Sequence, residues 1–559
     1  MLRPIKYILS FVILTISIIS CKKNGFDINA DPNSPTNLPV QILLPTIQRE
    51  LGDNNSIGGI GGSLEVYVHR IAVREQPNGY GITGNGGIPG SIWDSYYQTV
   101  FTNADIIINN SNKVGNFRYA GIAKIVKAYA YSQLVDLFGD IPFSEASKLI
   151  DNIKNPKFDD DATIYPQLFS LIDDGIANLR NTAINVRNPA ADDLFYGGNI
   201  NNWVKLGNTL KLKLYTQQRR VKNVSSEVAA LLASPSTLIN NTSENFQISY
   251  TAVNKNPGYN DYGAAQRTQN ISPWFYEILK GYNNNIFSTN PDPRVPYYFY
   301  NQIKLGQTSV NDNNPTEYRD GSFVSIYFGS NGQDVGRTQQ NTAALLGIYP
   351  VGGKFDDGSG SIPTARITLA SATGAAPVRL LTYADRLYLE AELLNAGVIS
   401  GDAKAVTLAA VAESFKQVDA VVTKTGTTGV PILVGSPGVG TYISKFTMEY
   451  DAATTTKKLE MIMTQKWIST FGSGIDPYTD YRRTGFPILF DPRNPAMAPA
   501  GFVQPPINGN PLLNPQAKVA VSLNRDFPLS LPWPSTELTS NSNAPAQKQP
   551  STYKVFWQP

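Results

Sequence analysis

Apolar side chains recur every three or four residues in both halves of the chain, and this spacing places them on one face of a helix. The clearest case covers residues 118–138. Its Val126, Ala130 and Leu134 are each four positions apart. The same spacing predicts three further helices in the first half: one is capped by Ser91, one starts at Asp161 or Thr163, and one follows Asn202. In the second half it predicts helices over 383–396, where Thr382 is the cap, over about 402–422, and over 459–471. Consecutive amphipathic helices joined by short turns indicate helix pairs of the tetratricopeptide type, although no strict sequence repeat is present.

Three stretches lack this extended helical spacing, namely residues 246–378, about 423–450, and 487–559. The first is rich in Asn, Gly, Tyr and Pro, and its one clear helix is short, with Ser272 as the cap and Pro273 at the first position. The first and last stretches carry several aromatic residues. We therefore expect them to form ordered loops and short strands packed on the helical body, and long ordered loops usually carry function.

The N-terminus has the pattern of a lipoprotein signal. Arg3 and Lys6 precede an apolar block over 7–19, which is shorter than the roughly 18–20 residues that span a bilayer. Cys21 is the only cysteine of the chain, and the small residue Ser20 stands just before it. This arrangement resembles a bacterial lipobox, in which the thiol is acylated and becomes the new N-terminus; the alternative is a chance cysteine in an apolar segment. Because two or three acyl chains give a stable anchor, we expect a protein tied to a membrane without crossing it.

These features divide the chain into three parts. Residues 1–20 are the predicted signal peptide, and 21–40 are a lipidated tether that contains several prolines. Residues 41–559 are predicted to form a single domain, a helical body with loop-rich parts at about 246–378 and 487–559.

Composition removes several classes of function. The formal net charge is only 47 − 44 = +3 and no run of Lys or Arg forms a stripe, so binding to nucleic acid is not expected. His69 is the only histidine and lies in an apolar-leaning stretch, so we expect it to be structural. Triad catalysis and His-ligated zinc both need placed histidines. No cofactor is predicted.

Three loops combine glycines or amides with aromatic side chains, at 76–90, 259–267 and 323–337. An aromatic ring can cover the apolar face of a sugar, while amides, carboxylates and guanidinium groups satisfy the hydroxyls. From these loops and the short helix after Ser272 we select as candidate ligand-binding residues Tyr80, Tyr259, Asp261, Tyr262, Trp274, Tyr327, Asn331 and Arg337. For each of them the alternative is packing within its own loop.

Acidic residues offer two further hypotheses. Asp136, Asp140 and Glu145 could supply a pair of carboxylates for glycoside cleavage. The glycine and proline among them favour a helix exit instead, in which these acids are turn and cap residues. The sequence Asp356-Asp357-Gly358 could hold Ca²⁺ through oxygen ligands, but this motif is nonspecific, so bound Ca²⁺ is possible and unsupported.

Several strings, in order along the chain, resemble the SusD/RagB family of outer-membrane lipoproteins. They are Leu134-Val-Asp-Leu-Phe-Gly-Asp-Ile-Pro-Phe-Ser-Glu-Ala146, Asn202-Trp-Val-Lys-Leu-Gly-Asn-Thr-Leu-Lys-Leu-Lys-Leu214, Asp292-Pro-Arg-Val-Pro-Tyr297, Thr382-Tyr-Ala-Asp-Arg-Leu-Tyr-Leu-Glu-Ala-Glu392, Ile462-Met-Thr-Gln-Lys-Trp467 and Asp480-Tyr-Arg-Arg-Thr-Gly-Phe-Pro487. Any one of them is a weak signal, but together they cover essentially the whole chain.

The resemblance implies a mainly α-helical fold, with about four tetratricopeptide-type helix pairs packed with a loop-rich irregular region that contains short strands. It also implies a non-catalytic lipoprotein of the Gram-negative outer membrane, facing the cell exterior. Such a protein captures oligosaccharides, or peptides, and passes them to a SusC-like TonB-dependent transporter. One departure concerns export: the residues that follow Cys21 are acidic only at Asp27, so outward exposure is less certain than anchoring.

Two other classes of function stay open from the sequence. One is a secreted surface glycoside hydrolase, and the other is a helical-repeat scaffold or adhesin that binds only protein. The ligand itself is not identified, because loops set specificity in such proteins.

Overall fold

The structure is a computed structural model of the 559-residue chain. It describes residues 38–73, 79–80, 87–148, 152–183, 187–262, 269–304, 317–326, 328–329, 343–360, 372–491, 493–494, 497 and 522–559. Cys21 and the predicted signal peptide lie outside the described residues. None of the helices in the described part combines the length and the apolar character needed to cross a bilayer.

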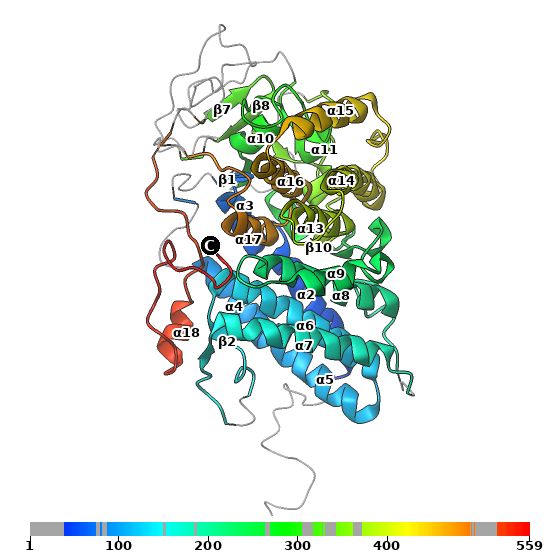
Figure 1. Ribbon diagram of the computed structural model, residues 1–559, viewed down its shortest axis with the longest axis vertical. Helices are drawn as coiled ribbons and strands as arrows, with labels where there is room; N and C mark the ends of the chain where they lie inside the picture. Colours follow the sequence, from blue (N-terminus) through cyan, green and yellow to red (C-terminus); the bar gives the residue numbers. More distant parts are fainter. Residues whose placement is uncertain are drawn as a thin grey trace, which may run out of the picture.

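Helices dominate the fold, as the sequence predicts (Figure 1). The N-terminal helices are α2 (Val40–Asn55), α3 (Ile60–Tyr67), α4 (Gly87–Asp94), the π-helix η2 (Ser95–Phe101), α5 (Thr102–Val114), α6 (Phe117–Phe138), α7 (Asp161–Arg180), α8 (Ile200–Gln218) and α9 (Ser225–Leu232). The later helices are α10 (Pro273–Leu279), α11 (Val295–Tyr298), α12 (Ile348–Val351), α13 (Tyr383–Asn395), α14 (Ala403–Thr425), α15 (Pro437–Ala452), α16 (Thr455–Ser469), α17 (Ile475–Thr484) and α18 (Ser535–Ser540). Helix α6 packs on both α5 and α7, α13 packs on α14 and α16, and α8 joins the two groups by packing on α13.

Local sequence signals account for several helix starts. Thr382 forms the predicted cap of α13, where its amide donates to the carboxylate of Asp385 at 2.8 Å and its hydroxyl accepts from the Asp385 amide at 3.2 Å. Asp160 caps α7 by accepting from the amide of Thr163 at 3.2 Å. Each cap satisfies an amide that has no partner within the helix.

Small residues let α6 and α7 pack closely. A Cβ on Gly121 would lie 2.7 Å from Cγ of Leu179 and 2.8 Å from the carbonyl oxygen of Gly175. Such distances are shorter than van der Waals contact, so only glycine fits at this crossing.

Two predicted caps are wrong. Ser91 lies inside α4, which already begins at Gly87. Pro89 falls in its first turn, where a missing amide proton breaks no helical hydrogen bond. Helix α8 begins two residues before the predicted cap Asn202, because the side chain of Asn199 accepts from the Asn202 amide at 3.2 Å.

Helix α15 lies in a stretch that the sequence pattern predicts as less helical. It begins with Pro437 at its first position and buries Tyr442, Phe446 and Tyr450, which are four residues apart. The glycines in its first turn lower the intrinsic helix propensity, but the burial of three rings outweighs that cost.

Short strands occur in the first loop-rich part, as expected, and three more (β1–β3) lie earlier in the chain, whereas the described residues of 487–559 contain none. The strands are β1 (Ile71–Val73), β2 (Ile141–Pro142), β3 (Phe158–Asp159), β4 (Phe246–Ile248), β5 (Gln269–Ile271), β6 (Phe299–Tyr300), β7 (Glu317–Asp320), β8 (Phe323–Ile326), β9 (Leu345–Leu346) and β10 (Val378–Leu381). Within the described ranges they form antiparallel pairs, β1 with β5, β2 with β3, β4 with β10, β6 with β9, and β7 with β8.

The C-terminal segment returns to the first helical group. The amide of Leu531 donates to the carbonyl of Leu137 at 2.7 Å, and the indole of Trp557 donates to the carboxylate of Asp136 at 3.0 Å. Asp136 also accepts from Tyr165 at 2.5 Å and from Gln217 at 2.8 Å. One continuous apolar core accordingly contains residues from Val40 to Trp557.

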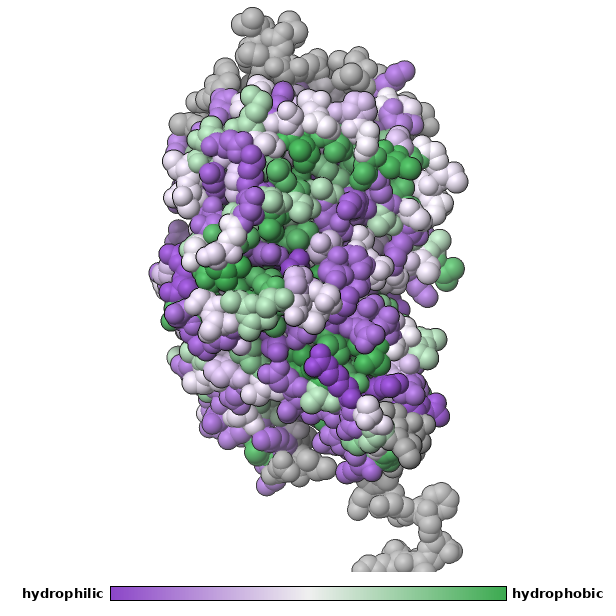
Figure 2. All heavy atoms as spheres, turned by 45° about the vertical axis from the view of Figure 1, so that its right-hand side comes forward, coloured by the Kyte–Doolittle hydropathy of each residue, from purple (hydrophilic) through white to green (hydrophobic). Residues whose placement is uncertain are grey.

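The surface shown in Figure 2 mixes polar and apolar residues. Large apolar side chains that are exposed include Ile432, Val434 and Met448. On the face shown, apolar residues occur in several separate areas, and scattered exposed apolar groups are normal for a folded protein.

An ion cluster around the buried pair of Glu392 and Arg483 joins α13, α17 and the C-terminal end of α8. The carboxylate of Glu392 accepts from Nη2 of Arg483 at 2.7 Å and from Nε of Arg219 at 2.7 Å, and Arg483 also binds Asp480 at 2.9 Å. Burial by itself raises the pKa of Glu392, but the two guanidinium groups outweigh burial and lower that pKa to about 2.

We predict that Glu392→Gln lowers the free energy of unfolding by about 3 kcal/mol at neutral pH, because it removes the carboxylate charge shared by two guanidinium groups and leaves the buried Arg483 with only Asp480 as an anionic partner. The folded-state pKa of Glu392 lies below its ordinary value, so its contribution is complete above about pH 4.5 and declines as the pH falls toward 2. Urea denaturation at a series of pH values should therefore show the two proteins converging in acid. Asp451→Asn is the control, because it breaks an exposed pair with Lys404 and should cost less than about 1 kcal/mol. Equal losses in the two variants would contradict the prediction.

Candidate functional site

The three loops selected from the sequence leave the body at neighbouring strands. The first follows β1 and the second precedes β5, and these strands pair with Val73 opposite Gln269. The third begins with β8, where the hydroxyl of Ser325 donates to the carbonyl of Ile271 in β5. The strands therefore bring the described ends of these loops together, although the ends are far apart in the sequence.

An aromatic cluster joins the first and third loops. The ring of Tyr80 lies 5.3 Å from Phe328, 5.9 Å from Tyr67 and 6.0 Å from Phe527, measured between centroids. His69 lies 4.0 Å from Phe328. Tyr80 is 5% exposed, so in this conformation its ring covers protein side chains.

His69 is buried in this cluster, which agrees with the structural role expected from the sequence. It is 2% exposed, and neither ring nitrogen has a hydrogen-bond partner. Burial disfavours the imidazolium and lowers the pKa of His69 to about 3. At neutral pH the ring is therefore neutral, and its pKa is far from that of an efficient general acid or base.

The second loop is held by its own aromatic residues. Tyr259 and Tyr262 stack with their centroids 4.9 Å apart, and they are 0% and 2% exposed. The hydroxyl of Tyr259 donates to the carbonyl of Ala372 at 2.9 Å, and the carboxylate of Asp261 accepts from the Gln269 amide at 3.2 Å. In this structure these side chains shape the loop; their contact with a ligand stays a prediction.

Trp274 also packs against protein. It is 5% exposed, its indole donates to the carbonyl of Ile488 at 3.2 Å, and its ring stacks on Phe490 at 5.4 Å. Tyr327, Asn331 and Arg337 lie outside the described residues.

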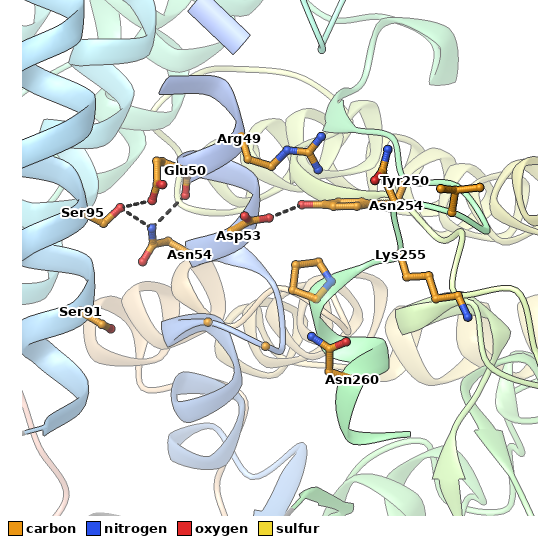
Figure 3. Close-up of a pocket in the computed structure, with 14 residues that line it drawn as sticks. Arg49, Glu50, Asp53, Asn54, Ser91, Ser95, Tyr250, Asn254, Lys255 and Asn260 are labelled. Carbon is orange, nitrogen blue, oxygen red and sulfur yellow. Dashed lines mark hydrogen bonds between the residues drawn. The ribbon is translucent and has the colours of Figure 1, made fainter. Parts of the chain in front are cut away.

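A large open groove lies beside the start of the second loop, with a volume of about 680 Å³ (Figure 3). Two parts of the helical body and one loop segment supply its polar lining. Helix α2 provides Arg49, Glu50, Asp53 and Asn54; α4 and η2 provide Ser91 and Ser95; and the segment after β4 provides Tyr250, Asn254, Lys255 and Asn260.

Hydrogen bonds fix the helical side of the groove. The hydroxyl of Ser95 donates to the carboxylate of Glu50 at 2.5 Å, and the amide of Asn54 donates to Ser95 at 2.8 Å. These bonds connect α2 with η2, so their polar side chains keep a defined arrangement along one wall.

The opposite wall carries the Tyr250 ring and the Lys255 ammonium, and Asp53 and Arg49 of α2 contact that ring across the groove. The hydroxyl of Tyr250 donates to Asp53 at 2.8 Å, and burial together with that carboxylate raises the pKa of Tyr250. The guanidinium carbon of Arg49 lies 5.4 Å from the centroid of the Tyr250 ring, and the ammonium of Lys255 lies 5.1 Å from that of Tyr259. Both distances are in the range of cation–π attraction.

The two walls come close together because a glycine stands between them. A Cβ on Gly58 would lie 2.7 Å from the backbone of Pro257, so no other residue fits without moving one wall. Both residues line the groove.

Sequence reasoning missed the α2 wall. Arg49, Glu50, Asp53 and Asn54 form one polar strip at the end of a helix whose other face is buried. A helical pattern that starts at Val40 could have revealed them, but this segment adjoins the predicted tether, where no helix is predicted.

The acidic motifs have structural partners. Asp140, Asp160 and Asp161 place carboxylate oxygens within 4.8 Å of one another. Each of these carboxylates, however, accepts a hydrogen bond from a backbone amide, as turn and cap residues do. Asp140 accepts from the amide of Asp161 at 3.0 Å, Asp160 from that of Thr163 at 3.2 Å, and Asp161 from that of Phe556 at 2.9 Å. Asp356 accepts from Asn301 at 2.7 Å, and Asp357 accepts from Ser359 at 2.6 Å.

Comparison with known proteins identifies the family that has this architecture. The family model described as "Starch-binding associating with outer membrane", SusD-like, matches residues 32–504. The chain belongs to the SusD-like family.

Solved structures agree on the fold of this SusD-like protein. A chitin-binding protein matches with a TM-score of 0.66 and 19% identity over 93% of this chain and 100% of the other. A chitin-binding SusD homologue from Flavobacterium johnsoniae has a TM-score of 0.61 and 19% identity, and the match covers 90% of this chain and 94% of the other. A SusD homologue from Bacteroides fragilis has a TM-score of 0.63 and 20% identity, and the match covers 90% of this chain and 94% of the other. No curated protein sequence matches the chain.

The neutral buried His69 should make the stability of this SusD-like protein depend on pH. The folded-state pKa lies below the ordinary value of 6.5, so the unfolded chain takes up a proton first and stability falls as the pH drops from 6.5 toward 3. We predict that between pH 7 and pH 5 the natural protein loses about 2 kcal/mol more of its free energy of unfolding than His69→Phe does.

Chemical denaturation of both proteins at the two pH values measures this difference. The phenylalanine keeps a ring and a Cβ at a position where φ is 56°, so backbone strain is similar in both. Parallel pH dependence in the two proteins would refute the assignment of a buried neutral imidazole.

Proposed function

We propose that this protein is a non-catalytic carbohydrate-binding lipoprotein of the outer membrane, which captures oligosaccharides and passes them to a SusC-like TonB-dependent transporter. The observation that carries the binding role is the open groove, in which amides, hydroxyls, carboxylates and two cations surround a tyrosine. This lining matches a polyol, whose hydroxyls both donate and accept hydrogen bonds. The family description and the two chitin-binding structural matches support the same ligand class.

The anchoring and transport parts rest on other observations. Anchoring rests on Cys21 and the apolar block before it. Transfer to a transporter rests on family membership, and the family model describes association with the outer membrane. A peptide ligand is the alternative cargo.

We predict that Arg49→Ala and Asn260→Ala each weaken binding of chito- or malto-oligosaccharides about five- to tenfold, because each removes a contact worth about 1 kcal/mol. Isothermal titration after a glycan and peptide array measures this effect. Lys404→Ala, an exposed charge that does not line the groove, should leave affinity unchanged.

Tyr80→Ala and Tyr327→Ala test the loops in the same titration. If these two substitutions abolish binding while the groove variants do not, the ligand lies on the loops and the groove assignment is wrong.

Release of new reducing ends by the purified protein would contradict the non-catalytic role and favour the hydrolase. Binding of protein partners alone would favour the scaffold.

Lipid anchoring gives a separate prediction. In cells that produce the full chain without a SusC-like transporter, Cys21→Ala should move the protein from the membrane fraction to the soluble fraction, because the acyl chains are then its stable attachment. Fractionation and mass spectrometry of the mature N-terminus measure this. Membrane retention of the variant would contradict the anchor.

A further inference from the structure

We propose that a second hollow binds the same carbohydrate chain as the groove, so that the protein holds an extended, neutral oligosaccharide across both. This inference rests on the proposed function and adds a second subsite, a ligand length and a charge class to it. The second hollow is defined by Tyr300, Gly353, Lys354, Asp357, Ala372 and Thr428.

The second hollow is large enough for part of a ligand. Its volume is about 520 Å³, compared with about 680 Å³ for the groove. Ligand sites in proteins occupy roughly 300–1,000 Å³, so each hollow can accept a short piece of a sugar chain.

A pair of stacked rings lies between residues that line the two hollows. Lys255 lines the groove and places its ammonium 5.1 Å from the ring of Tyr259. Tyr259 stacks on Tyr262 at 4.9 Å. On the far side of the stack, a Cβ on Gly353 of the second hollow would lie 3.0 Å from Cε2 of Tyr262.

A second connection crosses the same wall. The hydroxyl of Tyr259 donates to the carbonyl of Ala372 at 2.9 Å, and Ala372 lines the second hollow. Thr373 also lines the second hollow. A Cβ on the next residue, Gly374, would lie 3.0 Å from the side chain of Lys255, which lines the groove. The sequence-selected tyrosines, which are 0% and 2% exposed, thus form a buried wall between the linings of two open spaces.

The lining of the second hollow repeats the chemistry of the groove. The ammonium of Lys354 lies 5.0 Å from the centroid of the Tyr300 ring, as Lys255 lies near Tyr259. Asp357 is held by Ser359, whose hydroxyl and amide donate to it at 2.6 and 2.9 Å. Cation, ring, carboxylate and hydroxyl therefore recur on both sides of the buried tyrosine wall.

Charge selects the class of ligand. The groove lining contains Arg49 and Lys255 against Glu50 and Asp53, so its formal charge is 2 − 2 = 0. The second hollow contains one of each sign, Lys354 and Asp357, so its charge is 1 − 1 = 0. A polyanionic glycan would meet carboxylates in both places, whereas neutral sugars find donors and acceptors without net repulsion.

The test titrates the full mature chain with chito- and malto-oligosaccharides from the disaccharide to the octasaccharide. For the natural protein we expect affinity to rise with length until both hollows are filled, at one oligosaccharide per protein. Thr428→Trp obstructs the second hollow from an exposed turn, and Lys354→Ala removes its cation. Both should weaken octasaccharide binding about tenfold and change disaccharide binding by less than about twofold, because the groove retains the shorter ligand.

Matched variants separate obstruction from unfolding. Thr428→Ser and Thr539→Trp, the latter on exposed α18, should bind every length like the natural protein, and melting curves verify that each variant is folded. Asn260→Trp, which obstructs the groove, should weaken all lengths.

Three results would overturn this inference while leaving the proposed function intact: affinity that is independent of length, two octasaccharides bound per protein, or no effect of Thr428→Trp on the octasaccharide. Binding of charged uronic-acid oligomers in preference to neutral ones would also overturn it. If the natural protein binds no oligosaccharide of either series, the proposed function fails, and this inference fails with it.

Discussion

A buried ion pair between Glu65 and Arg70 holds together the parts of the chain that position the candidate site. Both side chains are 0% exposed, and Nε of Arg70 lies 2.5 Å from the Glu65 carboxylate. The other guanidinium nitrogens donate to the carbonyls of Trp467 and Ser473 at 2.5 and 2.9 Å, and Glu65 accepts from the Gly472 amide at 2.9 Å. Burying two charges is costly unless every polar atom finds a partner, and here backbone groups about 400 residues away provide those partners.

The pair fixes the backbone on which the loops depend. Trp467 donates its indole to the carbonyl of Val68 at 3.0 Å, and the carbonyl of Arg70 accepts from the Ser272 amide at 3.0 Å. His69 lies between these two anchors and β1 follows them directly. The turn after α16, β1 and the residue before α10 therefore form one rigid base. The groove is also partly ordered in advance: Ser95 is hydrogen-bonded to Glu50 and Asn54, and Tyr250 to Asp53, which limits the ordering cost of binding.

The elements predicted best are those whose causes lie within a few residues. The cap of α13 depends on Thr382 and Asp385, three positions apart, and both the residue types and the spacing are visible in the sequence. Family membership was likewise predictable, because it rests on strings of side chains that pack within and between successive helices. Helix α15 was missed because its weak local propensity is overcome by burial of Tyr442 and its neighbours against other elements, which a local pattern does not report.

The sequence by itself determined the helical body, the short strands of the first loop-rich part and the aromatic and amide chemistry of the loops. Tertiary structure decided which of those groups face open space. Tyr259 and Trp274 have the composition of ligand-binding residues, but their exposure depends on Ala372 and Ile488, which are more than 100 positions away. The groove arises where α2 meets the segment after β4, nearly 200 residues later. Side-chain type is a local property, whereas burial is set by whatever the folded chain places next to it.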